Sequence, residues 1–142
     1  MSFWTHVNAS FRLDNLDNYS EEEMNNIFGK SVLWGNRGTG NWDDYDKHPE
    51  QYLPCGSEGS LQLSVWRNPD KSHLFTNLVS VFGDLRDYDN ASLIEEWFTE
   101  VCNSEDLLIR QAVCEVNIPP IVHEMYMWHG EGVEKFSLKY KV

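Results

Sequence analysis

Apolar and polar residues alternate along positions 3–13, and this period of two predicts a β-strand. The odd-numbered positions, from Phe3 to Leu13, fall on one face of that strand. The even-numbered positions fall on the other face, which carries Trp4 and Arg12. We therefore expect one apolar face for a core and one polar face that also bears an aromatic side chain.

Two segments have helical spacing instead. Ser20 followed by Glu23 is typical of a capping box, which predicts a short helix over 20–29. A second helix is expected over 90–102, where apolar residues recur at helical intervals at Leu93, Ile94, Trp97, Phe98 and Val101. The acidic residues of that second segment fall between the apolar ones, so they are expected to face away from the core.

The remaining apolar runs predict further strands. They cover 60–67, 73–83, 107–118, 122–128 and 133–142. A turn at 68–71 joins the first two of these into a hairpin, and the last two flank a Gly-rich turn. Residues 84–90 are expected to form a charged loop. Residues 30–59 have no periodicity and are expected to form a long loop insertion.

This order of elements predicts a single α+β domain over residues 1–142. A ferredoxin-like split β-α-β is expected, with an antiparallel sheet and two helices on one face. Residues 119–142 would add a C-terminal β-hairpin, which could extend the sheet or cover its open face.

Charge divides the chain unevenly. Residues 1–106 carry 19 acidic residues against 7 Lys and Arg, whereas residues 107–142 carry 4 of each, so the whole net charge of −12 lies in the first part. The acids gather at 14–23, 43–46, 84–89 and 95–106. A folded acidic surface repels nucleic acid and membrane anions and attracts basic proteins. The pattern predicts an acidic helical layer over a more neutral sheet.

Cysteine usage and hydropathy indicate the compartment. Three cysteines without a CxxC pair favour a reducing environment over a disulfide framework. We expect no signal peptide and no membrane span, and hence a cytoplasmic protein. None of Cys55, Cys102 and Cys114 is expected to act as a nucleophile.

The candidate partner-binding residues combine acids with aromatic side chains on the polar strand faces. Trp4 and Trp66 would lie in a core if both sheet faces were covered, and in a binding surface if one face were open. The full set is Asp43, Asp44, Asp46, Asp84, Asp87, Asp89, Glu95, Glu96, Trp4 and Trp66.

Two alternatives use other residues. A small-nucleotide sponge would use the Gly- and Trp-rich loop 34–46, with Trp34, Arg37, Trp42 and Arg86 as ligand-binding residues. A metal-dependent hydrolase would use Asp43, Asp44, His48 or His123. The histidines have no metal-ligand spacing and the acidic loop has no EF-hand pattern, so we expect no metal, no cofactor and no catalytic residue.

Three stretches carry a resemblance to known proteins: the start Ser2-Phe-Trp-Thr-His-Val7, the Gly56-Ser-Glu-Gly59 segment, and the Phe82-Gly-Asp-Leu-Arg-Asp87 segment. With them, most of the chain resembles a group of small phage-encoded proteins of unassigned function. The resemblance implies a bacterial cell under infection, and it carries no catalytic residues.

The sequence therefore leads us to expect an accessory protein of a phage or prophage. It would bind and inhibit a host macromolecule, such as a defence system, by imitating the negative charge of nucleic acid. The expected partner is a host protein with a basic surface.

Overall fold

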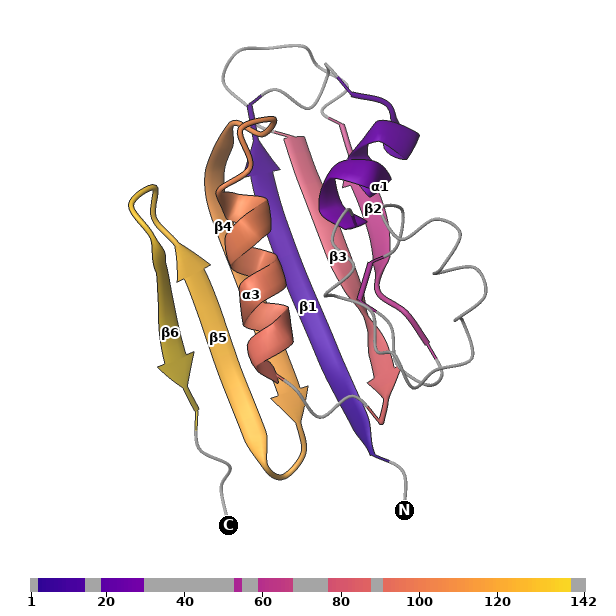
Figure 1. Cartoon of the computed structure of the whole chain (residues 1–142), viewed down its shortest axis with the longest axis vertical. Helices are drawn as coiled ribbons and strands as arrows, with labels where there is room; N and C mark the ends of the chain where they lie inside the picture. Colours follow the sequence, from indigo (N-terminus) through magenta and orange to yellow (C-terminus); the bar gives the residue numbers. More distant parts are fainter. Residues whose placement is uncertain are drawn as a thin grey trace.

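The computed structural model describes residues 3–14, 19–29, 53–54, 59–67, 77–87 and 91–138. Its elements in chain order are β1 (Trp4–Leu13), α1 (Glu21–Gly29), β2 (Gln62–Trp66), β3 (Asn77–Arg86), α3 (Ala91–Cys102), β4 (Ile109–Ile118), β5 (Val122–Trp128) and β6 (Val133–Ser137). The described part of the chain is thus an α+β protein with two helices and one six-stranded antiparallel sheet (Figure 1). The α+β class, the antiparallel sheet and the two helices agree with the prediction.

Strand β1 lies inside the sheet, whose strand order is β2-β3-β1-β4-β5-β6. All ten of its residues pair with β3, from Trp4 opposite Arg86 to Leu13 opposite Asn77. On its other side β1 pairs with β4. Strands β5 and β6 continue the sheet beyond β4, so they extend the sheet and do not cover its face.

The two faces of β1 differ as the alternation predicted. Val7, Ala9, Phe11 and Leu13 are buried, whereas the residues between them are exposed or half-buried. Matching buried positions on the neighbouring strands include Val79, Val81 and Cys114. One face of the sheet therefore forms the core.

Both helices pack on that same face. The Phe11 ring lies 4.9 Å from the Phe28 ring of α1 and 5.5 Å from the Phe98 ring of α3, measured between ring centroids. Figure 1 accordingly draws α1 over β2 and β3, and α3 over β4 and β1, on one side of the sheet. The opposite face carries no described helix.

The capping box at the start of α1 is confirmed. The Ser20 hydroxyl accepts from the Glu23 backbone N–H, and the Glu23 carboxylate accepts from the Ser20 backbone N–H, both at 3.2 Å. At the other end of the helix, the Trp97 indole N–H donates to the Phe28 carbonyl at 2.7 Å. Since the last carbonyls of a helix have no partner within it, Trp97 of α3 caps α1.

One boundary was wrong: residues 84–86 belong to β3 and not to a loop. The strand continues because β1 offers it partners, with His6 opposite Asp84 and Thr5 opposite Leu85. Leu85 is fully buried, while the charged residues on either side of it point to the other face. The charges that suggested a loop are thus the polar half of an alternating strand.

The chain leaves β3 through a left-handed residue, Asp87, at φ 56°. Its backbone N–H donates to the Phe3 carbonyl at 2.9 Å. Near this end of the sheet, Gly59 has φ +76°, and a Cβ placed on it would lie 2.2 Å from the Asp84 carbonyl oxygen. A glycine is therefore required where the chain before β2 passes beside Asp84 of β3.

The other expected elements fall close to the observed ones, within one or two residues for both helices and for the strands at 60–67, 107–118 and 122–128. Part of the strand expected at 73–83, at 73–76, and the end of the strand expected at 133–142 lie outside the described residues. Most of the loop expected at 30–59 lies outside them as well.

Candidate functional site

The described site residues fall on two different surfaces. Trp4, Trp66, Asp84 and Arg86 lie on the sheet face that is not covered by the helices, which we call the open face. Glu95 and Glu96 lie on α3, on the opposite side of the sheet, and Asp87 follows β3. Trp34, Arg37, Trp42, Asp43, Asp44, Asp46, His48 and Asp89 lie outside the described residues. The structure does not bring the described candidates together at one site.

Charge in the described elements divides between the two layers. Helices α1 and α3 contain six glutamates and no Lys or Arg. The six strands contain four acids (Asp84, Glu115, Glu124 and Glu134) and four basic residues (Arg12, Arg86, Arg110 and Lys135). The helical layer is therefore acidic, and the sheet is neutral by this count.

On α3 the acids stand apart from the apolar residues. Trp97 and Phe98 are fully buried, whereas Glu96 and Glu100 are exposed and Glu95 is half-buried. The helix packs its apolar side on the sheet and leaves Glu96 and Glu100 toward solvent, which is the arrangement that the spacing predicted. These carboxylates can attract a basic surface, and this electrostatic attraction weakens as the salt concentration rises.

The open face carries large apolar side chains in solvent. Trp66 is 53 % exposed, Phe82 43 % and Trp4 39 %, and each points away from the helices. On β6, Phe136 is exposed on the same face, opposite Met125 of β5. Aromatic side chains on a solvent-exposed sheet face are typical of binding surfaces.

Two histidine–carboxylate pairs also lie on the open face. His6 Nδ1 is 2.6 Å from Asp84 Oδ1, between β1 and β3. His123 Nε2 is 3.1 Å from Glu115 Oε2, between β5 and β4. The register places Asn117 of β4 between the two histidines, opposite both.

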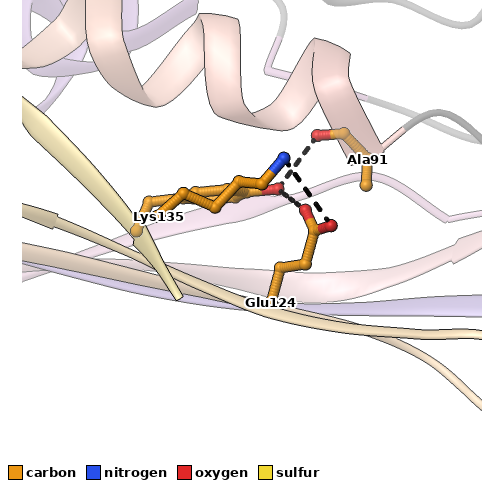
Figure 2. A network of polar contacts seen from close by, with 4 residues as sticks. Ala91, Glu124 and Lys135 are labelled. Atoms are coloured by element: carbon orange, nitrogen blue, oxygen red, sulfur yellow. Dashed lines mark hydrogen bonds and ion pairs between the residues drawn. The ribbon is translucent and has the colours of Figure 1, made fainter. Parts of the chain in front are cut away.

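A polar network on the helix side of the sheet joins β5 and β6 to α3 (Figure 2). The Tyr126 hydroxyl donates to Glu124 Oε2 at 2.5 Å, and the Ala91 carbonyl oxygen lies 3.5 Å from the same hydroxyl. Lys135 Nζ of β6 is 3.9 Å from Glu124 Oε1. Burial, the hydrogen bond to Glu124 and the charge of Glu124 all raise the pKa of Tyr126, so this side chain stays a neutral donor.

The buried cysteines have the properties of core residues. Burial raises the pKa of the Cys102 thiol to about 12. Burial, with smaller contributions from Cys102 and Glu115, raises the pKa of Cys114 as well. Because the thiolate is the reactive form, neither thiol is activated as a nucleophile.

Nothing in the described residues forms a metal centre. Among them, no three His, Cys, Asp or Glu side chains are grouped so that they could hold an ion. His123, which was a candidate catalytic residue for a metal-dependent hydrolase, forms a pair with Glu115. No helix within the described ranges is long and apolar enough to cross a bilayer.

The histidine–carboxylate pairs were missed at the sequence level. His6 and Asp84 are 78 positions apart, and only the β1–β3 register makes them neighbours. Period-two alternation did place His6 on the Trp4 face, but it gives no information about which strand lies beside β1.

Comparisons of the chain with protein-family models, curated protein sequences and solved structures gave no match.

Proposed function

We propose that this chain is an acidic binding protein, an accessory protein of a phage or prophage that inhibits a host macromolecule in the bacterial cytoplasm. Its acidic helical layer would occupy a basic, nucleic-acid-binding surface of a host protein, such as a component of a defence system. The sequence resemblance to small phage-encoded proteins supplies the biological setting. This function needs no cofactor and no catalytic residue.

The observation that carries the proposal is the separation of charge by layer. The two helices have six glutamates and no basic residue, whereas the strands are balanced. Within these elements the whole excess of negative charge lies in the helices, a distribution that solubility alone does not require. Carboxylates on one side of a protein give a directed field, which steers a basic partner toward that side.

A ferredoxin-like arrangement of the first six elements belongs to the same proposal. The strand order β2-β3-β1-β4 places β3 between β1 and β2, and α1 precedes β2 while α3 precedes β4. This order supports a split β-α-β in which both helices cover one face. Strands β5 and β6 would be its C-terminal hairpin extension, and the extension would leave the acidic helices uncovered.

The test is a pair of charge variants with the same net charge. The first, which we call the helical-layer variant, removes the three glutamates of α3, half of those in the two helices, with Glu95→Gln, Glu96→Gln and Glu100→Gln. The second neutralises the sheet and its turns with Asp84→Asn, Glu131→Gln and Glu134→Gln. Each variant removes three negative charges and takes the formal net charge from −12 to −9.

Both variants and the original chain are immobilised and exposed to bacterial lysate, and the captured proteins are eluted with duplex DNA. Capture is compared at about 50 mM and about 200 mM salt, a range across which phosphate-like electrostatic binding weakens strongly. We expect the original chain and the sheet variant to hold the same basic proteins, and the helical-layer variant to lose them. Equal capture by the two variants, or capture that neither DNA nor salt reduces, would contradict the proposal.

A further inference from the structure

The centre of the open face is hollowed. A depression of about 340 Å³ is lined by Asn8 and Ser10 of β1, Ser80 and Phe82 of β3, Val113 and Glu115 of β4, and Met125 of β5, with Ala9 below. This volume is at the lower end of the range for small-ligand sites, so it fits a single side chain or a small molecule.

The register explains why the sheet is hollow at this place. Phe82, Asn8, Glu115 and Met125 form one row across four neighbouring strands. In the adjacent row Ser80 lies opposite Ser10, and on the other side Ser80 lies opposite Ser64 of β2. Small hydroxyl side chains thus form the floor, and the larger Phe82 and Met125 form the sides.

The lining is rich in hydrogen-bond acceptors and contains one carboxylate. Glu115 uses Oε2 for His123, and among the described residues its Oε1 has no hydrogen-bonding partner. The amide of Asn8 and the hydroxyls of Ser10 and Ser80 add three more oxygen acceptors. Among the described residues that line the hollow none is Lys or Arg, so they offer no cationic group to a phosphate.

We propose that this hollow receives the guanidinium group of an arginine side chain from the basic partner protein. A guanidinium offers five N–H donors in one plane and no acceptor, which matches a floor of oxygen acceptors. Its face stacks on an aromatic ring, and Phe82 supplies that ring at the side of the hollow. Its methylene stem is apolar, as are Val113 and Met125.

Lysine fits this lining less well than arginine does. An ammonium group is a compact charge with three donors, and it gives up more hydration for fewer contacts in a shallow site. An anionic ligand meets Glu115 and the field of a chain with a net charge of −12. The arginine assignment rests on the proposed function for the basic character of the partner. Because the hollow lies across the sheet from the acidic helices, it would be a second contact, separate from the one that the helical layer makes.

The experiment adds a blocked peptide, acetyl-Gly-Arg-Gly-amide, to the full chain. Binding is followed by nuclear magnetic resonance, through changes in the chemical shifts of the protein's backbone amides. Two matched peptides replace arginine with lysine or with citrulline, which keeps the shape of arginine without its charge. The protein variants are Glu115→Gln and Phe82→Leu inside the hollow. The control is Glu134→Gln, which removes a carboxylate from the same face on β6.

The arginine peptide should shift the amides of Asn8, Ser10 and Ser80. Glu115→Gln and citrulline should each weaken binding about tenfold, because both remove a charge-assisted hydrogen bond. Phe82→Leu should weaken binding about threefold by removing the ring face. The control variant should bind the arginine peptide as the original chain does.

Three results would overturn the assignment: no binding of the arginine peptide, equal binding of that peptide to the Glu115→Gln variant, or equal binding of the citrulline peptide to the original chain.

The helical-layer variant separates this inference from the proposed function. If that variant binds the peptide as weakly as Glu115→Gln does, the attraction is a general field and the hollow is not a site. If the Glu115→Gln and Phe82→Leu variants still capture the basic host proteins fully, the hollow fails while the proposed function stands.

Discussion

Replacing Trp97 with phenylalanine tests how the two acidic helices are held together. The change removes the indole N–H that donates to the Phe28 carbonyl at 2.7 Å. That carbonyl lies in the last turn of α1, where the helix itself offers no donor. Trp97 and Phe28 are both fully buried, so the carbonyl would lose its donor inside the core.

The expected cost has two parts. An acceptor left without a partner in the core costs about 1–3 kcal/mol. The space left by the smaller ring, next to Phe11, adds about 1–2 kcal/mol. We therefore expect the free energy of unfolding to fall by about 2–5 kcal/mol, which for a chain of this size lowers Tm by about 7–17 °C.

Urea unfolding followed by far-ultraviolet circular dichroism measures this difference, and Trp66→Phe is the matched control. Trp66 is 53 % exposed on an edge strand, so its replacement should change the free energy of unfolding by less than about 0.5 kcal/mol. Amide exchange should also quicken in α1 more than in β1. If Trp97→Phe costs no more than Trp66→Phe, the hydrogen bond does not hold the helices together.

Three further predictions concern stability. Gly59→Ala should destabilise the fold by several kcal/mol, because the new Cβ would lie 2.2 Å from a backbone oxygen. Gly130→Ala has open space around it and should cost only about 1 kcal/mol, the strain of a left-handed backbone at a residue with a side chain. The midpoints of urea unfolding compare the two variants. Tyr126→Phe should cost about 1–3 kcal/mol because it leaves a half-buried carboxylate without its donor, and an unchanged urea midpoint would argue against the network of Figure 2. Burial raises the pKa of Cys102 to about 12, and it also raises the pKa of Cys114. The folded chain therefore keeps two thiol protons that the unfolded chain releases near the ordinary thiol pKa of 9.0. The free energy of unfolding should thus hold steady below that pH and fall above it by up to about 1.4 kcal/mol per pH unit for each thiol, and a variant with alanine at both positions should lose this part of the fall.

Local patterns predicted the elements well because each element carries its own signal. The reciprocal Ser20 and Glu23 hydrogen bonds follow from residues three apart, and the buried side of α3 follows from its spacing. The failure at residues 84–86 has the opposite cause. Their strand conformation is imposed by pairing with residues 4–6, and local composition does not contain that information.

The same limit applies to the candidate sites. The sequence predicted that Trp4 and Trp66 share the polar side of the sheet, and both do lie on the open face. It did not predict the hollow, because Phe82, Asn8 and Glu115 become neighbours only through the order of the strands. Glu95 and Glu96 were grouped with the tryptophans by charge and aromatic character, whereas the sheet separates them.

The interior position of β1 has a consequence for how the chain folds. Its partners on both sides come from much later in the chain, with Trp4 opposite Arg86 and His6 opposite Asn117. Closing such distant pairs costs conformational entropy before any contact repays it, so a topology of this kind folds in milliseconds to seconds rather than microseconds. On the ribosome, β1 would wait with both its edges unpaired until β3 and β4 had been made. During that interval its apolar side, including Phe11 and Leu13, would be available to chaperones, and the acidic helices could not yet dock.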